Sequence, residues 1–517
     1  MLRILLICVF SCALTACAVA PLPMTSQQIE SLKNEDFSMA FKDVDPFGTH
    51  MAMTEAVARG LKYNLDHRAK QMEQAIALGT HELSKYDMLP KVLASAGYNY
   101  RNNNFITQGV GAYSGRSAVG EPFVSSAREY NTQGLNLNWS LLDFGVGYFN
   151  AKQNGDRILI AAERRRRTMH VLIQDIQTAY LRAAAAQKLK DGLVKTIIDA
   201  NEALENAQKI EAQGLRAPLE SLRYQKSLLD NVKILETISQ ELATAKVELN
   251  QLINLPAQAD YVLDDPEKMA PPSTFADVDT KEFELRAMLY NADLNESVYN
   301  ARIAVEETRK SMLRLIPGLT FNVGPQKTNN NYWINQHWVE GSANISFNLW
   351  NLLTGPEVIR LAGQNADLAK HKRLMVRMAV ISQVHLAKMG FESSGLLYQR
   401  SVRIDAVDSK IAKLTADKEK KGAASQAERV AADASAIISK LRKYQALSQL
   451  FAASGKMRAT AGLEPDVAAL HEISLKELTE LVGANFDAWN RGLLPALLPN
   501  DMPKAAQGRD VSPVEQK

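Results

Sequence analysis

The side chains that could carry out chemistry are scattered along this sequence rather than gathered into motifs. Eight histidines occur, and none stands in an HExxH string or at another paired spacing that would hold a metal ion. The sequence also lacks a GxSxG nucleophile string and a phosphate-binding loop. We therefore expect no enzyme activity, no metal site and no cofactor.

One cysteine could carry covalent chemistry of another kind, the attachment of lipid. All three cysteines lie in the first 17 residues, in an apolar run that is too short to span a bilayer. The run ends in LTAC, with the cysteine at position 17, and this string resembles the lipobox of bacterial lipoproteins. Cleavage would remove residues 1–16 as a signal peptide and leave Cys17 to carry a diacylglycerol. An ordinary signal peptide with an incidental cysteine is the alternative.

Composition and charge exclude several classes of protein. The 517 residues include 60 Lys and Arg against 57 Asp and Glu, so no strong basic field is available to hold nucleic acid. A mean hydropathy of −0.20 argues against a bundle of membrane-spanning helices. Glycine and proline are both scarce, which excludes a collagen-like chain and allows long helices.

The sequence repeats one plan twice. LKYNLD at 61–66 recurs as MLYNAD at 288–293, an offset of 227 that also pairs Pro90 with Pro317. An offset of 208 then pairs further landmarks, among them Gly155 with Gly363, Gly214 with Gly422 and Leu255 with Leu463. Each copy predicts a helix that ends at its proline, two alternating segments, and a long helical pattern that turns once at a glycine.

The helical patterns are too long for a compact domain. The first helix of each copy is expected over 53–88 and 281–314, and no proline occurs in 123–217 or 357–464. As one helix, residues 151–213 would extend roughly 95 Å, so we expect hairpins of coiled-coil-like helices. For the basic run Arg164 to Arg167 within this pattern, a solvated or inter-helix face is favoured over a binding patch.

Four segments alternate between apolar and polar residues, as strands do: 92–101, 134–141, 319–324 and 343–349. A half-buried strand of a soluble sheet is the ordinary explanation. Two features favour strands in a membrane, namely polar faces rich in Asn and Ser and a clustering of four of the five tryptophans. The aromatics expected at the membrane interfaces are Tyr98, Tyr100, Trp139, Trp333, Trp338, Phe347 and Trp350.

Four strands cannot close a barrel, and an open edge cannot stand in lipid. The barrel must therefore be shared between subunits. Two chains would give eight strands filled with side chains, whereas three would give twelve strands and a usable channel. We expect three.

The order of these features resembles the TolC family of outer membrane factors, in its lipidated branch. The resemblance covers about residues 51–465 and rests on the repeat plan, on a proline before each strand pair, and on three strings. These are WSLLDFG at 139–145, QDIQTAY at 174–180, and a second tip of the form Gly-x-x-Ser/Thr-x-x-acid at 422–428. It implies a mainly α fold with a β-barrel contribution, in which a homotrimer builds a 12-stranded β-barrel continuous with a 12-helix α-barrel tunnel.

The resemblance also assigns roles to the hairpin tips, at 214–220 and 422–428. Glu428 and Glu220 match the positions at which the family places carboxylates that narrow the periplasmic aperture. Matching positions for adaptor contact are Gly214, Arg216, Gly422 and Ser425. The alternative for the two glutamates is helix capping, because Ser425 with Glu428 forms a capping box and Pro218 precedes Glu220 in a first helical turn.

The expected domain plan follows from these boundaries. It comprises a signal peptide (1–16), a lipidated extended segment (17–52), repeat 1 (53–256), a linker (257–280), repeat 2 (281–465) and a C-terminal extension (466–517). The hairpins are expected at 91–142 and 318–351. The extension should be helical to about residue 498 and a disordered tail from about residue 500.

The resemblance implies an exit duct in the outer membrane of a Gram-negative bacterium, with a tunnel that projects into the periplasm. It would serve a tripartite efflux or type I secretion system, with a periplasmic adaptor and an inner-membrane RND or ABC transporter as partners. Outer-membrane lipid is the other expected partner, and nucleic acid is not. The competing hypothesis is a lipid-anchored periplasmic coiled-coil scaffold without a pore.

Overall fold

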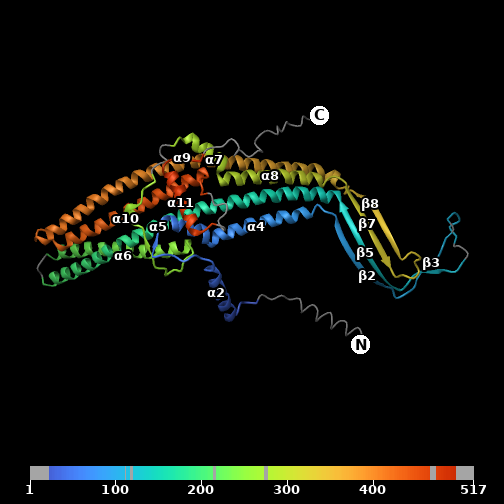
Figure 1. Ribbon diagram of the computed structural model, residues 1–517, viewed down its shortest axis with the longest axis horizontal. Coiled ribbons are helices and arrows are strands. Elements are labelled where there is room, and N and C mark those ends of the chain that lie inside the picture. The colour runs from blue at the N-terminus through green and yellow to red at the C-terminus, as the bar shows by residue number, and fades with distance from the viewer. Residues whose placement is uncertain are drawn as a thin grey trace.

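A computed structural model describes residues 22–110, 112–116, 120–213, 217–272, 278–465 and 473–495. They form a long rod, with strands at one end and the tips of helical hairpins at the other (Figure 1). The predicted signal peptide, Cys17, Gly214, Arg216 and the predicted disordered tail lie outside the described residues.

The elements follow the predicted plan of two similar halves. The first half contains α2 (Ser26–Ala40), β1 (His50–Met51), α3 (Met53–Tyr63), α4 (Leu65–Tyr86), β2 (Lys91–Tyr100), β3 (Phe105–Thr107), β4 (Phe123–Ser126), β5 (Glu129–Ser140), α5 (Leu141–Ala212) and α6 (Pro218–Leu252). The second contains β6 (Val262–Leu263), the 3-10 helix η1 (Pro266–Lys268), α7 (Thr280–Tyr290), α8 (Ala292–Leu313), β7 (Gly318–Thr328), β8 (His337–Ser346), α9 (Asn351–Lys420), α10 (Gln426–Ala461) and α11 (Leu475–Asn490). The mainly helical fold with a strand contribution is confirmed.

The helix expected over 53–88 is broken, and so is its counterpart over 281–314. Asn64 separates α3 from α4 and Asn291 separates α7 from α8, each with an extended backbone. Both side chains accept hydrogen bonds from the first turn of the next helix. The repeated Tyr-Asn pair is thus a helix boundary, since an asparagine that caps a helix competes with helix continuation.

The segment 17–52 was expected to be extended, and this was wrong for α2. Thr25 and Gln28 form a capping box that starts this helix. No residue of α2 is buried. The helix projects from the side of the rod, away from both of its ends (Figure 1).

The four long strands form one antiparallel sheet in the order β2-β5-β7-β8. The hairpins are shorter than expected, because β5 ends at Ser140 and β8 at Ser346, where the chain turns toward α5 and α9. Ser140 caps α5 by accepting from the N–H of Asp143, so the string at 139–145 is a strand-to-helix junction. The longer first connection carries a separate small hairpin, β3 with β4.

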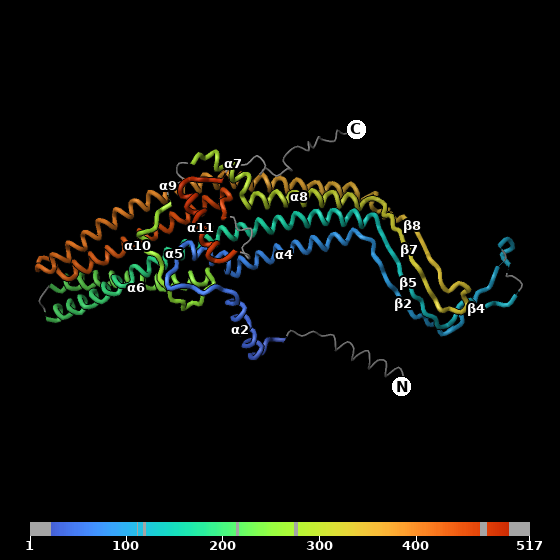
Figure 2. Tube along the Cα trace, viewed as in Figure 1, coloured from blue at the N-terminus to red at the C-terminus, as the bar shows by residue number. Residues whose placement is uncertain are grey.

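The helices continue the sheet as a single layer of the same order. Next to the strands, α5 packs between α4 and α8, and α8 packs on α9. Toward the tips, α6 takes the place of α4 and α10 that of α8, so the order becomes α6-α5-α10-α9. Figure 2 shows α5 and α9 running unbroken from the strands to the tips. Each chain is therefore a curved layer four elements wide along its whole length.

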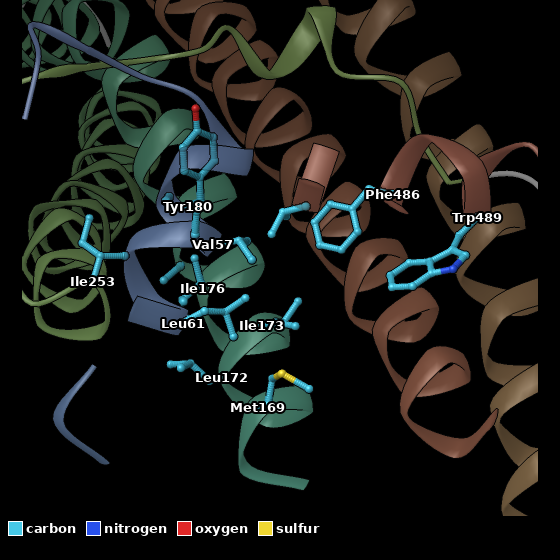
Figure 3. Packing of buried hydrophobic residues seen from close by; sticks show 14 of the residues in the cluster. Val57, Leu61, Met169, Leu172, Ile173, Ile176, Tyr180, Ile253, Phe486 and Trp489 are labelled. Atoms are coloured by element: carbon cyan, nitrogen blue, oxygen red, sulfur yellow. The ribbon is translucent and has the colours of Figure 1, made fainter. Parts of the chain in front are cut away.

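A hydrophobic core lies at mid-length of the rod, where shorter helices pack on the layer. Val57 and Leu61 of α3 pack on Ile173 and Ile176 of α5, and Phe486 of α11 belongs to the same cluster (Figure 3). The C-terminal extension thus contains the expected helix, but this helix ends at Asn490, earlier than the expected limit near residue 498. The cluster fixes α3 and α11 onto one face of the layer.

The basic run of α5 lies at helix interfaces, as one of the two favoured explanations had it. Arg164 and Arg167 both pair with Glu296 of α8 at 2.8 Å. Arg166 pairs with Glu163 on its own helix and with Glu464 after the end of α10. These pairs connect three helices of the layer.

Candidate functional site

The pairing register divides the sheet into two chemically different faces. Directly opposite residues share a face, since side chains alternate along a strand. Val92 pairs with Leu137, Leu137 with Val323, and Leu319 with Ile345. The apolar residues of this face are Val92, Ala94, Ala96, Leu135, Leu137, Trp139, Leu319, Phe321, Val323, Pro325, Val339, Ala343 and Ile345, and toward the far end the same face also carries Gln133, Lys327 and His337.

The other face of the sheet is polar and internally hydrogen-bonded. Asn138 donates its side-chain amide to Asn322, and Asn322 donates in turn to Ser342. Asn344 donates to the same serine hydroxyl at 3.2 Å. This chain of side chains crosses β5, β7 and β8, so the polar face of the sheet is continuous across three strands.

The aromatic residues predicted at the membrane interfaces fall into separate groups. Tyr98 and Tyr100 lie at the far end of the apolar face, and Trp139 lies on the same face at the helical end. Phe347 and Trp350 follow β8, at the same helical end. The register places Trp338 elsewhere, opposite Gln326 on the polar face, where its ring contacts that of Trp333.

The second hairpin tip has the turn and the capping box that the sequence indicated. Gly422 has φ +70°, and the N–H of Ala423 closes the turn on the carbonyl of Lys418. The N–H of Ser425 donates to the Glu428 carboxylate at 2.9 Å, while the N–H of Glu428 donates to the Ser425 hydroxyl. Capping therefore accounts for the residue type, and the Glu428 side chain lies at the tip, where it is exposed to solvent.

The first tip is described only on its returning side. Pro218 is the first residue of α6, and Ala217 before it makes no side-chain cap. Glu220 lies in the first turn of α6 and is exposed. The two candidate aperture carboxylates thus occupy equivalent places, in the first turns of α6 and α10.

A cluster around Arg429, which the sequence analysis did not identify, joins the two hairpins near their tips. Arg429 of α10 pairs with Asp199 of α5 at 2.7 Å and with Glu419 of α9 at 2.8 Å. It also pairs with Asp433 on its own helix at 3.2 Å. Only the position of this arginine directly after the capping box hints at such a role. One cation thereby holds carboxylates from three helices.

Both edges of the layer expose apolar residues in heptad positions, a second feature that the sequence analysis missed. On α4 the heptad positions are Leu65, Ala69, Met72, Ile76, Gly79, Leu83 and Tyr86, and the large ones among them are at least half exposed. On α9 the exposed residues at spacings of seven and fourteen are Leu361, Leu368, Met375, Met389 and Leu396. A search for this spacing in the sequence would have found both series. They lie on the sides of α4 and α9 that point away from the rest of the layer, opposite the buried residues of each helix.

Glu464 lies at a partly buried junction with Arg166 and His170. The His170 Nε2 lies 3.0 Å from one carboxylate oxygen, and Arg166 contacts the other. Burial alone would raise the pKa of Glu464, but the hydrogen bond from His170 and the charge of Arg166 outweigh burial and hold the pKa below its usual range.

Replacing Glu464 with Gln should therefore reduce stability at neutral pH by about 2 kcal/mol and make it less sensitive to acid. A carboxyl with a depressed pKa stabilises the fold above its unfolded pKa, and this contribution disappears as the pH falls through the folded value. Denaturant unfolding at pH 7 and at pH 4 measures both effects. The exposed Glu480→Gln is the matched control, and an equal loss of stability at both pH values in Glu464→Gln would contradict the assignment.

No group of three or more potential metal ligands occurs within the part of the chain that the structure describes. In the same residues, no helix is both long and apolar enough to cross a bilayer. The arrangement offers surfaces, namely a two-faced sheet, two apolar edges and a charged tip.

Comparison with known proteins agrees with this arrangement. Residues 59–255 match the family model described as outer membrane efflux protein. No curated protein matches the chain.

The fold is similar to solved outer membrane channels. The CmeC channel of Campylobacter jejuni is 12 % identical, with a TM-score of 0.63 over 83 % of this chain and 89 % of that chain. VceC of Vibrio cholerae is 11 % identical, with a TM-score of 0.59 over 80 % and 97 %. The open MtrE channel of Neisseria gonorrhoeae is 14 % identical, with a TM-score of 0.57 over 80 % and 89 %. The first repeat therefore matches the outer membrane efflux protein family model, and both repeats share the fold of solved outer membrane channels, in agreement with the resemblance to TolC-family factors.

Proposed function

We propose that three copies of this chain form an outer-membrane exit duct, through which a tripartite efflux or type I secretion system expels its cargo. The duct is a passive conduit rather than an enzyme. The observation that carries the proposal is the sheet, which has one apolar face and one polar face and continues directly into a helical layer of the same width and order.

The aromatic levels of the apolar face are separated by about the height of a membrane. Tyr98 and Tyr100 pair with Asn131 and Glu129, eight and ten positions along β5 from Trp139. At about 3.4 Å per residue and a strand tilt of about 40°, the two aromatic levels lie ~21–26 Å apart along the membrane normal. Outer-membrane strands carry an apolar band about 25 Å tall between aromatic girdles. The proposed lipid contact includes Trp139, Phe347 and Trp350 at one interface and the two tyrosines at the other, but omits Trp338.

The open edges of the sheet support a shared barrel. Within one chain, the outer sides of β2 and β8 have no neighbouring strand in the described sheet. Successive strands are antiparallel, so β8 of one copy can pair antiparallel with β2 of the next. Three copies give twelve strands and a lumen lined by the asparagine and serine face.

The apolar edges of the helical layer support the same assembly. In a ring, the free side of α9 meets the free side of α4 of the next copy. Their exposed heptad residues would then form a coiled-coil seam, which covers apolar surface that one chain leaves in water. Twelve helices would surround a tunnel below the barrel.

The position of the other parts follows from this orientation. The strand end lies in the outer membrane, anchored in addition by lipid at Cys17, and the tips point into the periplasm. The tips meet a periplasmic adaptor through the loops that contain Gly214, Arg216, Gly422 and Ser425. An inner-membrane RND or ABC transporter supplies the energy. The duct opens when the hairpins untwist at the Arg429 cluster.

Glu428 and Glu220 would form acidic rings at the aperture. The double variant Glu428→Gln and Glu220→Gln should reduce the preference of the channel for cations over anions, because it removes six negative charges per trimer while glutamine preserves the capping box. Reversal potentials in planar bilayers under a salt gradient measure the preference. Glu236→Gln, an exposed position farther up α6, is the matched control. An unchanged reversal potential would exclude both glutamates from the aperture.

Single-channel recording tests the proposed function. The purified full-length protein should insert into planar bilayers and give discrete conductance steps. A coiled-coil scaffold whose strands form a soluble sheet would give none, and this result would favour the competing hypothesis.

A further inference from the structure

Asn64 lies at a point where three helices of the first repeat meet. Its N–H bonds to the Gly60 carbonyl in α3, and its Oδ1 accepts from the N–H of His67 in α4. Its Nδ2 donates to the carbonyl of Leu252, the last residue of α6, at 3.0 Å. Asn64 therefore ends α3, begins α4 and holds the C-terminal end of α6.

Asn291 makes the same three connections in the second repeat. Its N–H bonds to the Ala287 carbonyl of α7, and its Oδ1 accepts from the N–H of Leu294 in α8. Its Nδ2 donates to the carbonyl of Thr460, one residue before the end of α10, at 3.2 Å. The backbone angles agree as well, with φ −60° and ψ 127° at Asn64 against −65° and 125° at Asn291. Two divergent halves of the chain thus keep one geometry.

The two returning helices also end alike. Asn254 after α6 and Gly462 after α10 both have a left-handed backbone, with φ 54° and 66°. The next residues, Leu255 and Leu463, are buried, and their N–H groups each bond to a carbonyl five residues earlier at 2.8 Å. This ending fixes where α6 and α10 stop. The asparagine amides therefore link these ends to α4 and α8.

Within the described residues, the helical layer is interrupted only at these two joints. At this level α5 and α9 are continuous, while α6 gives way to α4 and α10 gives way to α8. Bending α5 or α9 would strain several backbone hydrogen bonds, whereas a shift of α6 relative to α4, or of α10 relative to α8, breaks one side-chain hydrogen bond at the joint. Motion of the returning helices α6 and α10 relative to α4 and α8 should therefore concentrate at the joints.

We propose that Asn64 and Asn291 are paired hinge residues, whose side-chain amides set the angle between the returning helices α6 and α10 and the barrel-side helices α4 and α8. The proposal rests on the proposed duct function. They are positioning residues, because neither belongs to the tips or to the sheet. In this conformer the two ties act together with the Arg429 cluster to hold the hairpins close.

Serine at both positions separates the tie from the cap. A serine hydroxyl still accepts from the first turn of the following helix, but it is too short to reach the Leu252 or Thr460 carbonyl. Each lost hydrogen bond is worth about a fivefold change in the ratio of open to closed channel. Because the joints lie in different repeats, Asn64→Ser with Asn291→Ser should raise this ratio about 25-fold in planar bilayers. Asp279→Ser is the matched control, because Asp279 caps α7 through the N–H of Lys281 without such a tie.

A second measurement follows the hinge without relying on conductance. Spin labels at Ala75 of α4 and Lys226 of α6, both exposed, report the angle across the first joint in pulsed resonance experiments. The double serine variant should broaden this distance distribution, and the Asp279→Ser protein should match the unsubstituted chain. A lower melting temperature with an unchanged distance distribution would reduce the asparagines to structural caps and overturn the proposal. Failure of the unsubstituted protein to form channels would instead count against the duct. The distances between the spin labels would still test whether Asn64 and Asn291 act as hinges.

Discussion

Replacing Arg429 with alanine is expected to open the resting channel. The substitution leaves Asp199, Glu419 and Asp433 close together without their shared cation, on three different helices. Mutual repulsion and the lost charged hydrogen bonds then favour separation of the two hairpins. A charged hydrogen bond is worth about 2 kcal/mol, which corresponds to roughly a thirtyfold rise in the ratio of open to closed states. The mean current through the protein, reconstituted in planar bilayers, measures this ratio.

Two further variants isolate the cause. Arg442→Ala removes an exposed arginine from the same helix and should leave the current unchanged. Arg429→Lys keeps the charge but loses the planar guanidinium that contacts several carboxylates. Its mean current should therefore lie between those of Arg429→Ala and Arg442→Ala. If Arg429→Ala gave trimers with the same mean current as the unsubstituted protein, the Arg429 cluster would not be what keeps the resting channel closed.

Charges placed in the α4 seam are expected to abolish assembly. Ile76→Glu with Leu83→Glu changes two side chains that are 68 % and 69 % exposed in one chain, so neither should disturb the fold of the monomer. In the trimer each would face α9 of the next copy. Losing about 1.5–3 kcal/mol of burial at each of six positions costs about 9–18 kcal/mol per trimer. Light scattering of the purified protein in detergent should show monomers.

The neighbouring position provides a sharp control. Ala75→Glu introduces the same side chain on α4 at an exposed site outside the heptad positions and should leave the trimer intact. Helical content should be equal in the double variant, the control and the unsubstituted protein. A trimer that survived the double charge substitution would show that α4 does not line the seam.

Much of the fold could be predicted because its signals are local. Alternation in 134–141 predicted β5, and the proline-free span predicted α5, since both patterns report burial on one side of a regular element. The capping box at Ser425 placed the start of α10 correctly. The break at Asn64 lies within the repeated string LKYNLD. The residues on both sides of it favour helix, so the sequence predicted one continuous helix over 53–88. Only the bonds of its side chain distinguish a cap from a helical asparagine.

The rest depends on contacts between distant residues. Asp199 and Arg429 lie 230 positions apart, and nothing in the sequence near either one indicates the other. The face on which Trp338 lies depends on strand register, which is set by pairing with Gln326. The sequence therefore predicted the aromatic cluster but assigned one of its members to the lipid face, whereas the register places it on the polar face.

Disulfide cross-linking between β2 and β8 of neighbouring copies shows whether three chains close one barrel. All natural cysteines lie at or before position 17, so introduced pairs give unambiguous products. Cysteine at Ala94 of β2 is combined in turn with cysteine at Val339, Gly341, Ala343 or Ile345 of β8, and the membranes are oxidised. At least one pair should give covalent dimers and trimers with nothing larger, because a ring of three leaves no free edge. Monomers for every pair, or a ladder that continues beyond three, would contradict a barrel of three chains.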